Sequence, residues 1–421
     1  MLESLKEQDP EAYSAIVNEL RRQQQTLEMI PSENFCSKAV LEASASVLAN
    51  KYSEGYPKKR YYQGNKYIDD IELLAIERAK RLFNAEHANV QPYSGSPANM
   101  AVYVSVLEPG DKIMALNLAH GGHLTHGNPV NFSGKLFNFV HYTVERDTEL
   151  LDMEKIWKLA LKEKPKMIVS GYTAYPRLID FKKFHEIAQE INAYSMADIS
   201  HIAGLIAARV HPTPFPFTDF VMTTTHKTLR GPRGAVILCK EKYAKQLDKA
   251  VFPGLQGGPH EQTIAAKAVC FEEAMKPEFI EYGKQIVKNS KTLAETLMQK
   301  GIKLVSNGTD THLILIDLIN TKSVGKPGLG KDYAIALEEA GIVTNCNTIP
   351  YDPASPFRPS GIRLGTPALT SRSMKEPEMA QIGKWIAQII NEVENNKIII
   401  EIRKKVNELC KQFPLYPDIT Y

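Results

Sequence analysis

Long apolar runs, excess charge and cysteine are all scarce in this 421-residue chain, and each scarcity excludes a class of protein. No run approaches the ~20 apolar residues that a membrane-spanning helix needs. Basic residues number 51 and acidic residues 48, so a net charge of +3 gives no reason to expect nucleic acid or an anionic membrane as partner. The five cysteines are scattered and lack metal-ligand spacing, which indicates reduced thiols. Because the first ten residues are also too charged for a signal peptide, the sequence predicts a cytoplasmic protein.

The composition is that of a soluble globular protein, with 43% hydrophobic and 24% charged residues. A chain of this length exceeds one ordinary hydrophobic core, which predicts more than one domain. We expect an N-terminal helical arm at 1–28, a large domain at 29–276 and a small α+β domain at 277–421. Within the small domain, strands are expected at 303–306 and 313–318, and helices at 331–340, 375–392 and 397–412.

Strands alternate with helical stretches in the large domain, which predicts the α/β class. The expected strands are 88–90, 112–116, 167–170, 194–197, 217–221 and 235–239. Strands separated by helices indicate a mainly parallel sheet, and active residues gather at the carboxyl ends of such strands. Asp198, Thr173 and Lys227 all follow strand ends, so we expect them to form one constellation.

The stretch 222–234, MTTTHKTLRGPRG, organises the rest of the chain. Lysine is strongly hydrated and normally lies at the surface, so a lysine such as Lys227 where a buried strand ends is unusual. A solvated loop lysine is the ordinary interpretation. The neighbouring hydroxyls and glycines, however, suit a phosphate, and a lysine amine beside a phosphate suggests an imine to pyridoxal 5'-phosphate.

A second phosphate signal is the turn Ser94, Gly95 and Ser96, which precedes a helix expected to open near Pro97. This order places backbone N–H groups and two hydroxyls at a helix N-terminus, where anions bind. In isolation the turn is a weak motif that is better explained as a plain helix cap.

Two further blocks look like pocket walls. The stretch 51–64, KYSEGYPKKRYYQG, combines clustered tyrosines with Glu54 and Arg60 and so offers ring faces, hydroxyls and a carboxylate. The stretch 118–127, LAHGGHLTHG, holds three histidines, which raises the alternative of zinc. No carboxylate or cysteine spacing completes a metal set, and the glycine pair favours a wall against a flat ligand, so we expect no metal.

Pyridoxal phosphate would need several partners, and each has a candidate. Asp198 would pair with the pyridine nitrogen and keep it protonated. The phosphate would be held by Ser94, Gly95, Ser96 and Gly258. His123 would cover the ring face, with Thr173 and His201 near the phenolic oxygen. Arg363 would bind a substrate carboxylate through two parallel hydrogen bonds. The alternative interpretations are structural: Arg363 would form an ion pair at the surface, and His201 would be a hydrogen-bonded histidine of the core.

The chain resembles the serine hydroxymethyltransferases over nearly its whole length. The blocks that carry the resemblance are PSENF, NKYSEGYPKKRYYQG, NVQPYSGSPAN, LAHGGHLTHG, DISHIAGLIAA, TTTHKTLRGPRG, VFPGLQGGP, NTIPYDPASPF and SGIRLGTPALT. The resemblance implies fold type I of the pyridoxal-phosphate transferases, with a mainly parallel seven-stranded sheet. It implies conversion of serine and tetrahydrofolate to glycine and 5,10-methylenetetrahydrofolate, by a homodimer that shares its active sites.

The resemblance also implies roles for individual residues. The expected catalytic residues are Lys227, Glu54, His226, Asp198 and Thr224, with Glu54 handling protons. The expected substrate-binding residues are Ser32, Tyr52, Tyr62 and Arg363. The expected folate-binding residues are Tyr61, Leu118, Gly122, Leu124 and Asn347. Tyr52, Tyr62 and Gly258 are expected to reach into the neighbouring subunit's site.

Some positions depart from the family pattern, among them Pro31, Leu255 and Cys346. None removes an expected cofactor contact, but Leu255 and Cys346 lie in blocks on the folate side. Two alternatives therefore stay open beside the folate-dependent transferase. One is a folate-independent aldolase acting on 3-hydroxy amino acids, and the other is a noncatalytic dimeric relative. Dimer and tetramer are not distinguished.

Overall fold

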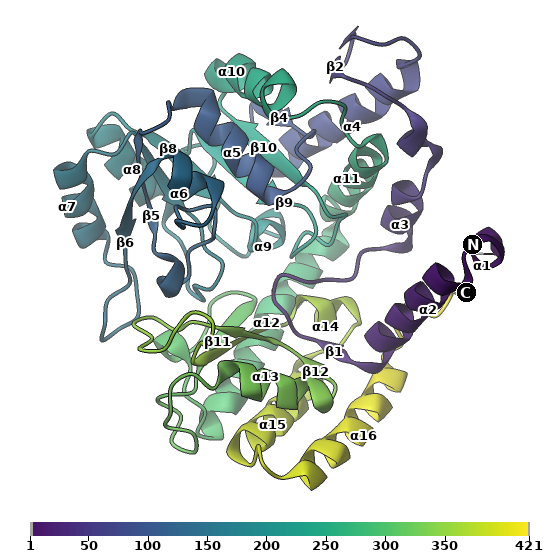
Figure 1. Ribbon diagram of the computed structural model, residues 1–421, viewed down its shortest axis with the longest axis vertical. Coiled ribbons are helices and arrows are strands. Elements are labelled where there is room, and N and C mark those ends of the chain that lie inside the picture. Colours follow the sequence, from purple (N-terminus) through teal and green to yellow (C-terminus); the bar gives the residue numbers. More distant parts are fainter. Residues whose placement is uncertain (1–2, 420–421) are drawn as a thin grey trace. The chain divides into compact units, whose positions relative to one another are not determined.

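The computed structural model describes residues 3–419 and divides the chain into two compact units (Figure 1). One unit comprises residues 34–287, and the other joins residues up to 33 with residues from 288 onward. The residues before and after the 34–287 unit thus form one unit together. The division into arm, large domain and small domain expected from the sequence stays a prediction. Among residues 3–419, no helix is both long and apolar enough to cross a membrane.

A seven-stranded sheet forms the centre of the 34–287 unit, in the order β4-β10-β9-β8-β7-β5-β6. The strands are β4 (His87–Asn89), β5 (Lys112–Leu116), β6 (Asn138–Tyr142), β7 (Met167–Ser170), β8 (Tyr194–Asp198), β9 (Phe220–Thr224) and β10 (Ala235–Cys239). Strand β10 runs in the opposite direction to the other six strands, so the predicted mainly parallel α/β sheet is confirmed.

Both faces of this sheet are covered, because its strands are apolar on both sides. Alternate residues of one strand enter different cores: Val221 of β9 packs into one cluster, and Phe220 and Met222 into another. The first cluster includes residues of α3 (Lys38–Ser44), α4 (Lys66–Phe83), α7 (Met153–Glu163), α8 (Phe181–Glu190), α9 (Ala203–Ala207) and α11 (Glu261–Ala274). The second includes residues of α5 (Gly95–Val106) and α10 (Ala244–Lys249), and the short helix α6 (Phe132–Leu136) packs against it.

Strand β9 begins later than predicted. The expected strand 217–221 is wrong at its start, because Pro214 accepts hydrogen bonds from the backbone N–H groups of Phe217 and Thr218 and so forms a turn. The strand instead continues to Thr224. Two of the threonines before Lys227 are therefore strand residues, and Thr224 lies at the carboxyl end of the inner strand β9.

The other unit is α+β. A three-stranded antiparallel sheet has the order β11-β14-β13, formed by β11 (Leu313–Asp317), β14 (Gly361–Gly365) and β13 (Asn345–Asn347). A parallel pair joins β1 (Leu27–Glu28) to β12 (Ile342–Val343). The helices are α1 (Glu3–Gln8), α2 (Pro10–Gln25), α13 (Gly330–Glu339), α14 (Pro367–Ser371), α15 (Glu376–Asn391) and α16 (Asn396–Gln412), and α12 (Pro277–Gln299) spans the division.

Two expectations for this unit are wrong. Residues 303–306 are not a strand, since Leu304 makes one isolated bridge to Ile316 and Ser306 has a φ of 54° that a strand cannot accommodate. The single helix expected at 1–28 is interrupted, because Asp9 caps a new helix that starts at Pro10 by accepting from the N–H of Ala12.

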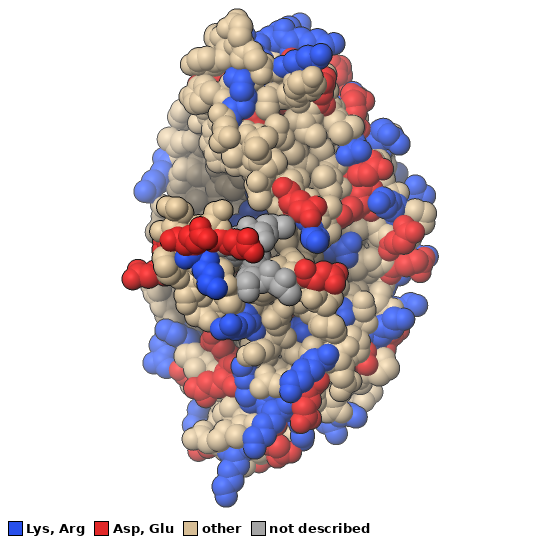
Figure 2. Space-filling model, turned by 90° about the vertical axis from the view of Figure 1, so that its right-hand side faces the viewer, with Lys and Arg blue, Asp and Glu red and all other residues tan. Residues whose placement is uncertain are grey.

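Acidic and basic side chains are interspersed over the face drawn in Figure 2. Many charges pair along single helices, as Lys405 does with Glu401. Such exposed pairs contribute little to stability, because water and salt screen them.

Arg372 joins the ends of α2 and α16. Its buried guanidinium donates to the carbonyl oxygens of Gln24, Thr26, Cys410 and Phe413 at 2.8–3.1 Å. The last carbonyls of a helix have no partner within the helix, so one side chain here satisfies the ends of two helices.

Arg372→Met should therefore destabilise the protein. Methionine keeps most of the side-chain volume but donates no hydrogen bond, and a buried acceptor left without a partner costs about 1–3 kcal/mol. We expect the free energy of unfolding in urea to fall by at least about 2 kcal/mol. The control is Arg358→Met, whose guanidinium is exposed and should change stability by less than about 0.5 kcal/mol. Equal effects of the two changes would contradict the assignment.

Candidate active site

The ends of β7, β8 and β9 and the N-terminus of α5 surround a pocket. Its lining residues are Gly95, Asn99, His123, His126, Tyr172, Thr173, Asp198, Ser200, His201, Met222, Thr224 and Lys227. The predicted constellation of Asp198, Thr173 and Lys227 is thus brought together. Gly171 makes this possible, since its φ is 116° and a Cβ there would lie 1.9 Å from the carbonyl oxygen of Asp198.

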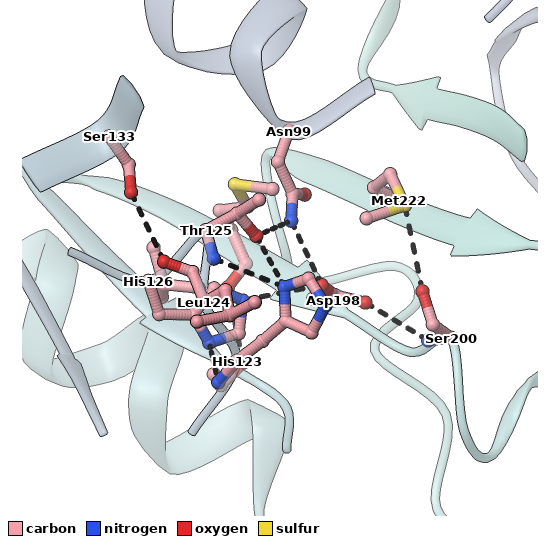
Figure 3. A network of polar contacts seen from close by, with 12 residues as sticks. Asn99, His123, Leu124, Thr125, His126, Ser133, Asp198, Ser200 and Met222 are labelled. Atoms are coloured by element: carbon pink, nitrogen blue, oxygen red, sulfur yellow. Dashed lines mark hydrogen bonds and ion pairs between the residues drawn. The ribbon is translucent and has the colours of Figure 1, made fainter. Parts of the chain in front are cut away.

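Asp198 is the last residue of β8 and is only 7% exposed. Its Oδ2 accepts from Asn99 Nδ2 at 3.0 Å and from His126 Nε2 at 3.2 Å, and its Oδ1 accepts from the backbone N–H of Ser200 (Figure 3). Burial alone would raise the pKa of this carboxyl, but the hydrogen bonds and the nearby His123 and His126 hold the pKa well below its usual range. Asp198 is therefore a buried carboxylate.

His126, Asn99 and Ser200 were not predicted as site residues. His126 accepts the backbone N–H of His123 at Nδ1, so its proton is assigned to Nε2, from which it donates to Asp198. His126 stood in the noticed histidine block, and Asn99 lies one helical turn after Gly95. Only the spacing along α5 could have indicated Asn99, because its partner is 99 residues away.

The group His123, His126 and Asp198 also has the composition of a metal site, with ligand atoms within 4.8 Å of one another. The hydrogen bonds favour a different role. His126 donates a hydrogen bond from Nε2 to Asp198. His123 Nδ1 lies 2.7 Å from Thr125 Oγ1 and accepts from the Thr125 N–H. A metal ion would have to displace these bonds. The arrangement instead orients two imidazoles around a carboxylate.

Lys227 lies in a turn that follows β9. The turn is closed by hydrogen bonds from the Thr225 N–H to Gly234 and from Thr225 Oγ1 to Pro232. Within it, Lys227 Nζ donates to Thr224 Oγ1 at 2.7 Å, and the carbonyl of Lys227 accepts from Asn34 Nδ2. The amine is thereby directed toward the sheet edge and lines the pocket, in agreement with the expectation from the sequence.

His226 is half-buried beside Lys227. Burial, followed by the positive charges of Lys227 and Arg233, lowers the pKa of His226 to about 3. Its Nδ1 is buried and has no hydrogen-bond partner among the residues that the structure describes. The imidazole is therefore neutral at physiological pH.

The N-terminus of α5 has the form of an anion cradle. Ser94 precedes the helix in an extended conformation, and its hydroxyl makes no capping bond to the helix. A Cβ on Gly95 would lie 2.9 Å from Thr224 Cγ2, so only glycine lets this helix end approach β9 so closely. The first N–H groups of a helix have no partner within the helix, so those at the start of α5 and the hydroxyls of Ser94 and Ser96 fit a phosphate here.

The remaining expected cofactor residues lie close by, apart from Gly258. Thr173 donates its backbone N–H to Gly121 at 2.8 Å, and the carbonyl of His201 accepts from Thr228 Oγ1 at 2.9 Å. His201 is a buried histidine that also lines the pocket, so its position is compatible with both a core role and a site role. Leu118 starts the short helix η2 (Leu118–His120), and Gly122 and Leu124 follow it, with Leu124 exposed.

The tyrosine block forms a separate cluster. In the described chain, none of the residues that line the pocket comes from 51–64 or from 257–258. Tyr52 donates to Glu54 Oε1 at 3.1 Å, meets Tyr62 edge to face at 5.1 Å, and lies 3.4 Å from the Cβ position of Gly258. Tyr61 is 70% exposed. Glu54 is therefore not among the residues that line the pocket around the lysine.

Ser32, Arg363 and Asn347 belong to the other unit. Arg363 lies in the middle of β14, is 7% exposed, and donates from Nε to Asn345 Oδ1 at 3.1 Å. Burial lowers its pKa to about 10. The alternative of a surface ion pair is wrong, since a guanidinium is buried here. Asn347 ends β13, and Cys346 beside it is half-buried.

A mainly parallel seven-stranded sheet with a lysine after β9 and a carboxylate at the end of β8 is typical of the pyridoxal-phosphate enzymes of fold type I. A family model described as serine hydroxymethyltransferase matches residues 5–386. The chain belongs to this family. It is a one-carbon transferase that uses pyridoxal phosphate and, as co-substrate, tetrahydrofolate, and it converts serine to glycine reversibly. Nothing in the match favours the aldolase alternative.

The low pKa of His226 has a measurable consequence. An ordinary histidine titrates near pH 6.5, so below that pH the unfolded chain binds a proton that the folded chain does not. This difference destabilises the folded state by about 2 kcal/mol between pH 7 and pH 5. In His226→Gln the loss of unfolding free energy over this range should be smaller by that amount. His260→Gln, which changes an exposed histidine, should keep the wild-type pH dependence. Identical curves for His226→Gln and wild type would contradict a buried neutral imidazole.

Proposed function

We propose that Lys227 carries the pyridoxal phosphate covalently and that Asp198 binds its pyridine nitrogen. The observation that supports this is the pocket itself, in which an amine and a buried carboxylate lie beside a helix N-terminus. Ser94, Gly95, Ser96 and Gly258 would hold the phosphate. His123 would cover the ring, and Thr173 and His201 would lie near its phenolic oxygen. When bound, the cofactor accepts electrons from the reacting carbon of the amino acid.

The chain's own residues prepare the pocket for this chemistry. Asp198 has to stay ionised to keep a proton on the ring nitrogen, and His126, Asn99 and Ser200 ensure this by donating to it. Thr224 orients the amine of Lys227 through the 2.7 Å hydrogen bond. The neutral His226 adds no positive charge next to that amine, so it does not oppose binding of a cationic amino group.

Substrate and folate would use the remaining predicted residues. Arg363 is proposed to bind the carboxylate of serine or glycine, with Ser32 beside it, because a buried guanidinium offers two parallel donors. Glu54 is proposed to transfer protons. Tyr61, Leu118, Gly122, Leu124 and Asn347 are proposed to bind the folate.

We further propose a cytoplasmic homodimer in which each site is completed by the second subunit. The support is the separation of two sets of residues within one chain. Lys227 and Asp198 line a pocket, whereas Tyr52, Glu54 and Tyr62 form a partly exposed cluster outside it. An exposed aromatic cluster beside a carboxylate is suited to cover a site on another copy of the chain.

Borohydride reduction of the purified enzyme should place the pyridoxyl label on Lys227. Lys267 is the matched alternative, since it is a fully buried lysine of the same unit, whereas Lys227 is half-buried. Its Nζ donates to the carbonyls of Val90, Pro92 and Ala235 at 2.7–3.0 Å, so its amine is occupied. Peptide mass mapping distinguishes the two. Lys227→Ala should lose the label together with serine cleavage, and label on Lys267 would overturn the assignment.

Mixed dimers test the shared site. Lys227→Ala and Tyr52→Ala should each be inactive, and after subunit exchange about one site in four should be intact. Serine cleavage with tetrahydrofolate should then recover to about that fraction of wild type. The control mixes Lys227→Ala with Asp198→Asn, whose changes lie in one pocket of one chain, so no hybrid site is complete. Recovery in neither mixture, with exchange shown by differently tagged subunits, would reject sharing.

A further inference from the structure

Glu261 is a buried carboxyl group that the site described so far does not use. It is the first residue of α11 and is 1% exposed. Its Oε1 accepts a hydrogen bond from Ser53 Oγ at 2.5 Å. Its Oε2 is buried and makes no hydrogen bond within residues 3–419. A carboxyl group buried with one hydrogen bond costs stability, which indicates a role other than stabilising the fold.

Ser53 is the residue between Tyr52 and Glu54. Its side chain is fully buried, whereas Tyr52 is 54% exposed and Glu54 is half-buried. The carbonyl of Ser53 accepts from Arg60 Nη1 at 2.8 Å, as does that of Gly55 at 3.0 Å. The backbone on both sides of Glu54 is thus fixed by Arg60. Among the residues that the structure describes, the inward Ser53 side chain is fixed by Glu261.

The hydrogen bond from Ser53 to Glu261 connects two segments that meet around Glu54. The segment before α11 contains Gly257, whose Cβ position lies 3.0 Å from Glu54 Oε1, and Gly258, which packs against the Tyr52 ring at 3.4 Å. Glu261 follows Gly258 by three residues and Gly257 by four. The bond from Ser53 to Glu261 therefore fixes the distance between the 52–54 segment and the glycine turn that it faces.

We propose that Glu261 is a positioning residue for Glu54, acting through Ser53. By holding the Ser53 side chain inward, it keeps the Glu54 carboxyl group and the Tyr52 hydroxyl directed outward together. The inference rests on the proposed role of Glu54 in proton transfer. Proton transfer requires donor and acceptor within hydrogen-bond distance, so a small displacement of this segment reduces the rate of turnover more than it reduces serine binding.

Charged groups surround Glu261 from three elements. Glu72 and Asp69 of α4 disfavour its ionised form, and Arg60 of β3 (Lys59–Arg60) favours it. Lys267 lies on α11 itself. Burial, as the largest influence, raises the pKa of Glu261 to about 7. The folded chain thus keeps a proton that the unfolded chain loses above pH ~4.5, so this group lowers stability as pH rises toward 7.

The test compares Glu261→Ala and Glu261→Gln in the holoenzyme. Glu261→Ala should lower kcat about ten- to a hundred-fold and change KM for serine by less than about two-fold. Glu261→Gln keeps an oxygen acceptor for Ser53 and should restore most of kcat. Ser53→Ala should resemble Glu261→Ala, and the double variant should be no worse than either, because both remove one bond.

The chain offers a matched control on the same helix. Ser37 Oγ donates to Glu273 Oε1 at 2.6 Å, so α11 carries a second serine–glutamate pair near its other end. Glu273→Ala should leave kcat and its pH profile unchanged. Glu261→Ala should alter the pH profile of kcat, since Glu54 would be displaced. If Glu261→Ala and Glu273→Ala lower kcat equally, the positioning role is rejected.

A readout that does not depend on activity is hydrogen exchange of the Tyr61 amide. This N–H donates to the carbonyl of Glu54 at 3.0 Å and so reports on the segment directly. Exchange should be faster in Glu261→Ala than in Glu273→Ala or wild type, and unchanged exchange would overturn the proposal. Glu54→Gln separates the two questions. If it keeps full transfer activity, the role of Glu54 fails, while exchange at Tyr61 still decides whether Glu261 holds the segment.

Discussion

The ionised state of the buried Asp198 is the condition on which the rest of the site depends. A carboxylate at the end of a central strand is expensive to bury, because it leaves water for a surrounding of low polarity. Three donors from three elements compensate: Asn99 of α5, His126 of the histidine block and the backbone of Ser200. Each of these hydrogen bonds also holds the segment that carries the donor against the end of β8. The need to keep one carboxylate ionised therefore positions several segments at the carboxyl ends of the strands.

Close backbone approaches make this arrangement possible. Gly95 brings α5 against Thr224 at the end of β9, and Gly171 brings the chain after β7 against Asp198. The N-terminus of α5, the lysine amine and the carboxylate therefore come within one pocket. A side chain at either glycine would separate these parts, which belong to segments up to 132 residues apart along the chain (from Gly95 to Lys227).

The region around Glu54, in the same unit, is held together by a different set of interactions. Around Glu54, hydrogen bonds of the buried side chains of Arg60, Glu72 and Glu261 hold a segment whose outer side chains are exposed tyrosines. Rigid backbone combined with exposed aromatic rings is typical of a surface that is organised in advance for a partner. In a member of this family, that organisation matters because tetrahydrofolate and serine have to meet within one site.

The sequence by itself determined the elements whose signals are local. The strands 112–116, 167–170 and 235–239 are found where continuous apolar runs predict them, and Lys227 and Asp198 line the pocket to which their places after strands assigned them. Tertiary structure decided what depends on distant partners. The start of β9 follows from a turn at Pro214, and the strand expected at 303–306 is excluded by the backbone of Ser306. His126, Asn99 and Glu261 gain their roles only from Asp198 and Ser53, because a hydrogen bond between residues 72 to 208 positions apart leaves no periodic trace in the sequence.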